Sequence, residues 1–344
     1  MQQQNIREKI EAYSTKVGSD PALTQGAGGN ISWKEGDTLW IKASGFWLQG
    51  ALKENIFLPV SIAQTKNDVF KDPAQNDQAS TTKNPPFEGQ LRPSIETALH
   101  AVMPHKVVVH LHPINALVYL VQKEGKKKLA AKLDSQNINW SWVDYRKPGP
   151  ELAQAVNSSR MLSPASNFFF LANHGILVGG DTLEEVEAQI NTVLDSLKAP
   201  SRLKDDSTST SEPIAELPDY RLETNGPIAS LANDPVSLNI LSQFWRLYPD
   251  HLMFLGLEPP IFKRYEDFIN KAESEGSDID YGILQNKGVF LKKTLSENKK
   301  AMLLCFAELL SRLTSENSFQ ELTIKEAYEL KSWDAEKYRI ALEK

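Results

Sequence analysis

The sequence predicts a mixed α/β protein built from two lobes. Its 344 residues exceed the size at which a single hydrophobic core stops growing. Strand-like and capped helix-like segments alternate along the first part of the chain. Residues 200–218 then have the composition of a linker. We therefore expect a first lobe at residues 1–199 and a second lobe at residues 219–344.

The N-terminal part predicts one helix followed by a strand pair. Residues 4–17 have helical character and end near Gly18. Residues 31–33 and 38–42 alternate as strands do, and turn-forming glycines bracket them. The stretch 65–91 is polar, rich in Asn, Gln, Lys and Pro, and has no period. Such a composition indicates a long surface loop.

Helices and strands continue to alternate through the rest of the first lobe. Pro93-Ser94 opens a helix in which Ser94 is the expected N-cap and Glu96 lies in the first turn, where the helix dipole favours an anion. The apolar run 107–109 then begins a strand. The later elements are expected as helices at about 114–134 and 150–160, a strand at 168–178, and a capped helix from 181 to about 198.

Composition and charge exclude several classes of protein. The chain is 41% hydrophobic and 24% charged, as ordinary soluble globular proteins are. Its net charge of −6 would repel a polyphosphate backbone, so no nucleic acid partner is expected. A single cysteine, Cys305, suits a reducing compartment. No signal peptide or long apolar run is present, so we expect a cytoplasmic protein without a membrane span.

Three histidines form the pattern that carries most chemistry. His110 and His112 are two residues apart on a strand, so they project to the same face. A third imidazole from another strand, His174, would complete a three-nitrogen set. Such a set holds a catalytic zinc and leaves one coordination position open. The alternative is that one histidine is exposed at a strand end and the other is bonded to backbone.

Glu96 also has two interpretations. An acid in the first turn of a helix stabilises that helix by about 0.3–1 kcal/mol. Placed near a zinc ion, Glu96 would instead be a candidate general acid–base.

A possible anion site surrounds a glycine-rich turn. Gly26-Ala-Gly-Gly-Asn30 resembles a phosphate cradle, because glycine lets backbone N–H groups approach an anion, although a simple turn has the same pattern. Further donors for the same anion are expected from Ser44, Gly45 and Ser94. Lys42 would add a fixed positive charge, or be a solvated lysine at a strand end.

The second lobe contains segments similar to segments of the first. Residues 171–178 resemble residues 284–291, and a capped helix follows each. Residues 103–109 likewise resemble residues 248–254. In this alignment the positions of the three histidines are taken by Leu255, Leu257 and Lys287, which no metal would bind. Either the second lobe is a degenerate repeat, or two ordinary strand–helix units are alike by chance.

Five short motifs resemble those of the class II aldolase/adducin family, in order and in rough spacing, over about residues 5–198. They are Gly26-Ala-Gly-Gly-Asn30, Ile41-Lys-Ala-Ser-Gly45, Pro93-Ser-Ile-Glu96, His110-Leu-His112 and Asn173-His-Gly175. The family includes fuculose-phosphate and rhamnulose-phosphate aldolases, ribulose-phosphate 4-epimerase and the non-catalytic adducins, which lack the histidine set. A second resemblance lies further along the chain, to the aldolase half of bifunctional rhamnulose-phosphate aldolase/lactaldehyde dehydrogenase proteins. It rests on Tyr248-Pro-Asp-His251 and Trp333-Asp-Ala-Glu-Lys-Tyr338.

The resemblance implies a three-layer α/β/α domain with a largely antiparallel central sheet, followed by a smaller α/β lobe. It implies that zinc is bound by His110, His112 and His174, and that Glu96 is the catalytic acid–base. It also implies that the phosphate is lined by Asn30, Ser44, Gly45 and Ser94. The family's aldolases have a second hydroxyl where this chain has Ile95, and Arg92 is a candidate replacement donor.

The expected function is therefore zinc-dependent retro-aldol cleavage of a ketose phosphate, such as rhamnulose or fuculose 1-phosphate, to dihydroxyacetone phosphate and an aldehyde. Decarboxylation, dehydration or epimerisation of a sugar or sugar-acid phosphate stays open, because those reactions use the same metal-held carbonyl. An adducin-like scaffold is the alternative from another class. The family's active sites lie between subunits, so we expect a homo-oligomer, either a dimer or a tetramer.

Overall fold

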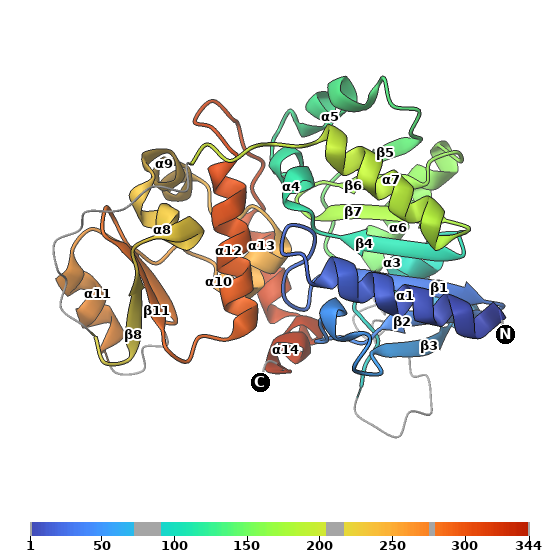
Figure 1. Ribbon diagram of the computed structural model, residues 1–344, viewed down its shortest axis with the longest axis horizontal. Helices are drawn as coiled ribbons and strands as arrows, with labels where there is room; N and C mark the ends of the chain where they lie inside the picture. Colours follow the sequence, from blue (N-terminus) through green and yellow to red (C-terminus); the bar gives the residue numbers. More distant parts are fainter. Residues whose placement is uncertain (1, 72–90, 204–216, 275–278, 343–344) are drawn as a thin grey trace.

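Two β-sheets organise the chain in its computed structural model, which describes residues 2–71, 91–203, 217–274 and 279–342 (Figure 1). We name the elements α1 to α7 the first lobe and the elements β8 to α14 the second lobe. The first lobe has a seven-stranded sheet in the order β3-β2-β1-β4-β7-β6-β5. The second lobe has a four-stranded sheet in the order β8-β11-β10-β9.

The elements of the first lobe follow the alternation that the sequence predicts. In chain order they are α1 Gln2–Gly18, β1 Asn30–Glu35, β2 Thr38–Lys42, the short 3-10 helix η1 Leu48–Gly50, β3 Phe57–Ser61, α2 Ile62–Val69, α3 Thr97–Val102, β4 Val107–Leu111, α4 Ile114–Leu120, α5 Gly125–Leu133, β5 Trp140–Val143, α6 Pro150–Leu162, β6 Phe168–Leu171, β7 Gly175–Gly180 and α7 Leu183–Ser196.

The large sheet is the middle layer of three. All its neighbouring strands are antiparallel except β5 and β6. Helices α1 and α7 cover one face and α3 and α6 the other (Figure 1). Side chains of β4 alternate between the two faces: Val107 and Val109 pack toward α7, and Val108 packs toward α3 and α6. The predicted three-layer α/β/α fold with a largely antiparallel sheet is confirmed.

The second lobe repeats part of this topology on a smaller scale. Its elements are β8 Tyr220–Glu223, α8 Gly226–Asn233, α9 Pro235–Gln243, α10 Pro249–Leu255, β9 Ile261–Phe262, α11 Tyr265–Ala272, β10 Tyr281–Leu284, β11 Gly288–Lys292, α12 Glu297–Ser311, α13 Ile324–Ser332 and α14 Asp334–Ala341. The strand order β8-β11-β10-β9, with a parallel pair at the β9 edge, matches β4-β7-β6-β5 of the large sheet.

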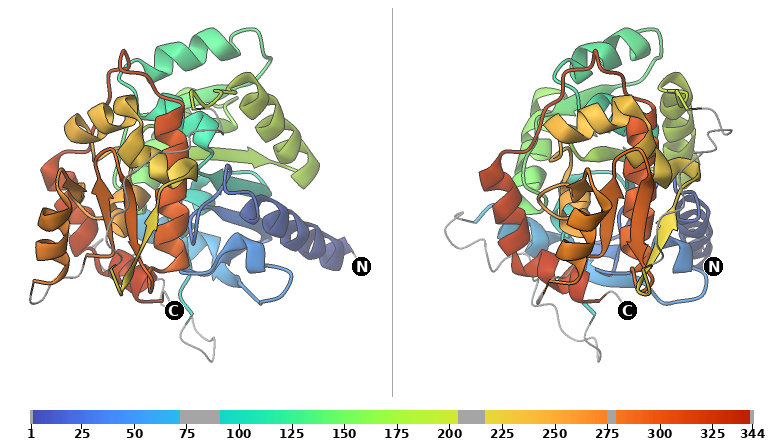
Figure 2. Two further views of the ribbon diagram at one scale, coloured as in Figure 1. Left: turned by 60° about the vertical axis from the view of Figure 1, so that its left-hand side comes forward. Right: turned by 90° about the vertical axis from the view of Figure 1, so that its left-hand side faces the viewer.

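The two lobes lie against each other. Helix α12 packs on α4 of the first lobe, and it stands between the second sheet and the first lobe (Figures 1 and 2). Leu342, just after α14, lies beside Gly45 of the first lobe. The side chain of Asn298, near the start of α12, accepts the backbone N–H of Ala27 at 3.0 Å. The second lobe therefore touches the glycine-rich turn of the first.

Several expectations about the first lobe are wrong in detail. The predicted strand 168–178 is a hairpin, because Asn173 has a left-handed φ of 54° and starts a turn between β6 and β7. The predicted helix at 114–134 is two helices with a break after Leu120. Ser94 is not an N-cap, since α3 begins at Thr97 and Ser94 lies in the preceding turn.

Two longer-range expectations also change. Residues 65–69, predicted as loop, complete α2, while residues 72–90 lie outside the described residues. Most of the linker predicted at 200–218 lies outside them as well. The likeness of 103–109 to 248–254 has no structural counterpart, because the first contains strand β4 and the second contains helix α10. In the described residues we find no helix that is both long and apolar enough to cross a membrane.

Candidate active site

The three histidines converge at one end of the large sheet. His110 is on β4, His112 follows that strand directly, and His174 lies in the turn between β6 and β7. Strands β4 and β7 pair with Leu111 opposite Ile176, which brings that turn beside His112. All three imidazoles are buried, and their candidate ligand atoms lie within 4.8 Å of one another.

The imidazoles turn the same nitrogen toward a common centre. The Nε2 atoms of His112 and His110 are 2.9 Å apart. Glu96 places its Oε1 3.2 Å from Nε2 of His110 and 3.0 Å from Nε2 of His174. The Nδ1 atom of His110 instead faces the carbonyl oxygen of Ile176 at 2.8 Å. Three buried nitrogens with a carboxylate beside them fit a divalent transition metal with an open coordination position.

Burial keeps one of these imidazoles in the form that ligates metals. It lowers the pKa of His112 to about 4, although the nearby Asp250 acts in the opposite direction. His112 is therefore a neutral imidazole at pH 7, with a lone pair available on one ring nitrogen.

Glu96 is fixed as an ionised carboxylate. Its other oxygen, Oε2, accepts a hydrogen bond of 2.7 Å from the side-chain amide of Asn30. Burial raises the pKa of Glu96, but attraction to His110 and hydrogen bonds from His110 and His174 outweigh burial, so its pKa lies well below the usual value. A carboxylate in this form is able to take up a proton.

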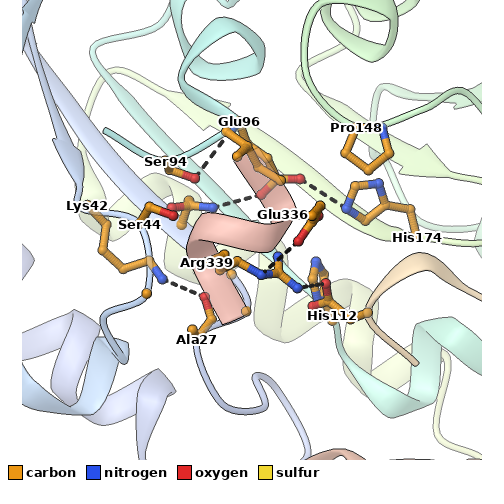
Figure 3. Close-up of a pocket in the computed structure, with 16 residues that line it drawn as sticks. Ala27, Lys42, Ser44, Ser94, Glu96, His112, Pro148, His174, Glu336 and Arg339 are labelled. Atoms are coloured by element: carbon orange, nitrogen blue, oxygen red, sulfur yellow. Dashed lines mark hydrogen bonds and ion pairs between the residues drawn. The ribbon is translucent and has the colours of Figure 1, made fainter. Parts of the chain in front are cut away.

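The predicted anion-binding residues line one cavity next to the histidines (Figure 3). The cavity brings together Asn30, Lys42, Ser44, Gly45, Ser94, Glu96, His112 and His174. Gly29 and Gly45 have left-handed φ values of 68° and 82°, which leave backbone free to curve around a ligand. Among the described residues, the buried Oγ of Ser44 and Oδ1 of Asn30 have no hydrogen-bond partner.

Lys42 lines the cavity and is also tied to backbone. Its ammonium donates hydrogen bonds of 2.7 Å to the carbonyl oxygens of Ala27 and Phe46, so it joins the glycine-rich turn to the turn after β2. Burial lowers its pKa to about 7. Lys42 is only 1% exposed, so the solvated alternative is wrong.

Arg92 is not placed as a replacement phosphate donor. It is exposed, its guanidinium stacks over the ring of Tyr338 at 4.2 Å, and it does not line the cavity.

Three charged residues of the second lobe line the same cavity, and sequence reasoning did not assign them to the site. They are Asp250 of α10 and Glu336 and Arg339 of α14. Arg339 pairs with Oδ1 of Asp250, and its Nε lies 3.2 Å from Oε2 of Glu336. The only signal in the sequence was the pair of family-like motifs at 248–251 and 333–338, which contain Asp250 and Glu336.

Helix α14 fills most of the room in the cavity. The remaining space is about 10 Å³, which is about the room for one water molecule. Burial raises the pKa of Glu336 to about 7, and Asp250 and Glu96 act in the same direction against Arg339. A sugar-sized ligand therefore needs the Glu336 and Arg339 side chains to move.

Comparison with known proteins places this chain in a family. Residues 8–199 match the family model of the Class II Aldolase and Adducin N-terminal domain. A curated relative, "Uncharacterized oxidoreductase YuxG" of Bacillus subtilis (strain 168), is 29% identical over an alignment of 194 residues, and the match covers 52% of this chain and 27% of that protein. The chain thus spans about a quarter of the length of that relative.

Solved structures of similar proteins cover a little over half of the chain. The N-terminal class II aldolase domain of a conserved protein from Thermoplasma acidophilum is 26% identical, with a TM-score of 0.47 over 55% of this chain and 90% of that one. L-fuculose-1-phosphate aldolase from Thermus thermophilus is 18% identical, with a TM-score of 0.38 over 56% of this chain and 93% of that one. Because the family model matches more than half of the 344 residues, this chain belongs to the class II aldolase/adducin family.

Proposed function

We propose that this chain is a metal-dependent lyase that cleaves a ketose phosphate, such as rhamnulose or fuculose 1-phosphate, to dihydroxyacetone phosphate and an aldehyde. One observation carries the proposal: three buried imidazoles share a centre with Glu96, whose Oε1 lies 3.0–3.2 Å from two of them. Family membership supports an aldolase-like, metal-dependent enzyme. A structural scaffold has no need for four buried titratable groups around one point.

In this proposal the metal is zinc or a similar divalent ion, held by His110, His112 and His174. When bound, it would act as a Lewis acid toward the carbonyl and the adjacent hydroxyl of the ketose.

Glu96 would move the proton on carbon. Cleavage breaks the C3–C4 bond: the C4 hydroxyl loses its proton to water as the aldehyde forms, and C3 later gains a proton from Glu96, which would first take one up from water. The two transfers balance, so the reaction needs no oxidant or reductant. The hydrogen bond from Asn30 to Oε2 keeps the Oε1 of Glu96 directed toward the histidines, and the reacting carbon would lie beside it.

The phosphate would bind in the cradle beside Glu96. The hydroxyl of Ser44 has no partner among the described residues and can donate to a phosphate oxygen, and Gly45 offers backbone in a left-handed conformation. The unpartnered Oδ1 of Asn30 is an acceptor, so it would suit a hydroxyl of the substrate. Arg339 would add a permanent positive charge once its guanidinium leaves Glu336 and binds the phosphate instead. Such an exchange would also open the cavity that α14 now fills.

A substrate panel with metal analysis tests this function. We expect about one zinc or similar ion per purified chain, and release of dihydroxyacetone phosphate from a ketose 1-phosphate, followed through NADH oxidation by glycerol-3-phosphate dehydrogenase. Unphosphorylated ketoses, ketonates and tetronates serve as the comparison set. A folded chain that binds no metal, or turnover of sugar acids with release of CO₂ instead, would replace the aldolase proposal.

A further inference from the structure

The metal-site histidines differ in what holds their outer nitrogens. Nδ1 of His110 faces a backbone carbonyl of its own lobe, that of Ile176. Nδ1 of His112 lies 3.2 Å from Oδ2 of Asp250, which belongs to helix α10 of the second lobe. For an imidazole to ligate through Nε2, its Nδ1 must carry the proton, and an acceptor on Nδ1 fixes that tautomer and the ring orientation.

We propose that Asp250 is the positioning residue of the metal centre. Its carboxylate accepts a hydrogen bond from the Nδ1–H of His112, and this bond holds Nε2 of that ring toward the other two histidines. The proposal rests on the metal site of the proposed function. It makes the first lobe's metal centre dependent on a side chain of the second lobe.

The two oxygens of Asp250 have separate tasks. Oδ1 pairs with Arg339. Oδ2 lies 3.2 Å from Nδ1 of His112 and has no hydrogen-bond partner among the described residues, so it is available to accept one from that imidazole. Asp250 is 5% exposed, so bulk water has little access to either oxygen. A permanent guanidinium charge on one oxygen keeps the carboxylate ionised, and an ionised carboxylate is the stronger acceptor for an imidazole N–H.

The backbone of the first lobe leaves room for this contact. A Cβ on Gly28 would lie 3.0 Å from Oδ2 of Asp250 and 3.2 Å from Nδ1 of His112. Any side chain there would push into the space where the carboxylate and the imidazole meet. The same Cβ would lie 2.9 Å from the backbone oxygen of Gln25, so the turn itself, together with the close approach of Asp250 and His112, requires glycine here.

A purely structural role predicts different behaviour. Asp250 lies in the first turn of α10, where an acid favours the helix dipole, and it neutralises the buried Arg339. If these were its only tasks, its removal would destabilise the fold and leave metal affinity unchanged in the molecules that fold.

Zinc affinity of Asp250→Ala and Asp250→Asn separates the two roles. The full chain is stripped with EDTA, and zinc is titrated in competition with a chromophoric chelator. We expect the affinity of Asp250→Ala to fall about 10–100-fold, and that of Asp250→Asn to fall less, since an amide oxygen still accepts the proton. The visible spectrum of the cobalt-loaded protein should shift as well, because the orientation of one ligand changes.

Asp234→Asn is the matched control. Asp234 also lies at the start of a second-lobe helix and pairs with an arginine, Arg202, but it does not line the cavity, so this variant should keep wild-type zinc affinity. Wild-type affinity and an unchanged cobalt spectrum in both Asp250 variants would overturn the proposal, and Asp250→Asn alone decides if Asp250→Ala does not fold. Failure of the wild-type chain to bind zinc would instead overturn the proposed function.

Discussion

The β6–β7 hairpin of the first lobe and the β10–β11 hairpin of the second have the same backbone but different chemistry. Asn173 and Asn286 take left-handed φ values of 54° and 60° in the two turns. Leu171 pairs with Gly175 across one turn and Leu284 with Gly288 across the other. The next residue after each asparagine is His174 in one hairpin and Lys287 in the other. The turn therefore forms without a histidine, and His174 needs an explanation outside the backbone.

Register extends the comparison to the other two histidines. Ile176, one residue after Gly175, pairs with Leu111, and Val289, one residue after Gly288, pairs with Glu223. The counterparts of His110 and His112 are thus Leu222 and Thr224, rather than the Leu255 and Leu257 of the sequence alignment. Both are half-buried, whereas His110 and His112 are buried. We propose that the second lobe is a degenerate repeat that kept the fold and not the ligands.

Exchanging His174 and Lys287, the residues that follow the two turn asparagines, should have the largest effect on metal content and activity. We expect His174→Lys to fold, because the same turn forms around Lys287, but to lose its metal and its lyase activity. The reciprocal Lys287→His should gain no metal, since Leu222 and Thr224 offer no further nitrogen. Metal analysis and circular dichroism of both variants check this. Full metal content in folded His174→Lys would remove His174 from the ligand set.

Glu96→Gln should retain the metal and slow turnover about 10²–10⁴-fold, the usual contribution of a general acid–base. The amide keeps the size of the side chain and cannot hold or deliver the proton that C3 gains. Measured kcat together with metal content tests this prediction. A wild-type rate would remove Glu96 from the mechanism. The three histidines alone would then account for the difference in chemistry between the first lobe and the second.

Arg339→Met should raise KM for a phosphorylated substrate about 10–100-fold with a smaller change in kcat, since a hydrogen bond to a charged group contributes about 1.5–3 kcal/mol. Lys337→Met is the control on the same helix, because Lys337 is exposed and pairs only locally with Asp334 among the described contacts. Equal KM values for the two variants would show that the second lobe contributes no phosphate contact.

The two turn asparagines should differ in their contribution to stability. Asn286→Ala should cost about 1–2 kcal/mol, because alanine is strained in the left-handed region, whereas Asn286→Gly should be close to neutral. Asn173→Ala should cost about 3 kcal/mol, since the Asn173 amide also donates hydrogen bonds to the carbonyl oxygens of Leu247 at 2.8 Å and Gln320 at 2.7 Å in the second lobe. Urea unfolding of the metal-free variants measures both values. Equal costs would indicate that Asn173 does not hold the lobes together.

Local patterns predicted much of the first lobe and little of the second. Strands β1, β2 and β4 and helices α1 and α7 follow from alternation, turn glycines and capping residues that lie close together in the sequence. The β6–β7 turn was missed because the apolar run 168–178 contains no common turn pair, and Asn173 takes its left-handed conformation partly through bonds to residues about 70 to 150 positions away.

The sequence by itself predicted the alternation of strands and helices, because that depends on local periodicity. Short motifs in fixed order carried the resemblance to a family, and that resemblance implied the three-layer fold and the set of histidines, carboxylate and cradle residues. Only the tertiary structure decided that Lys42 joins two turns, that Arg92 lies outside the cavity, and that Asp250, Glu336 and Arg339 lie inside it. Charges more than 80 residues apart meet through the packing of one lobe on the other. No local pattern encodes that packing, because it depends on the shape and burial of both surfaces at once.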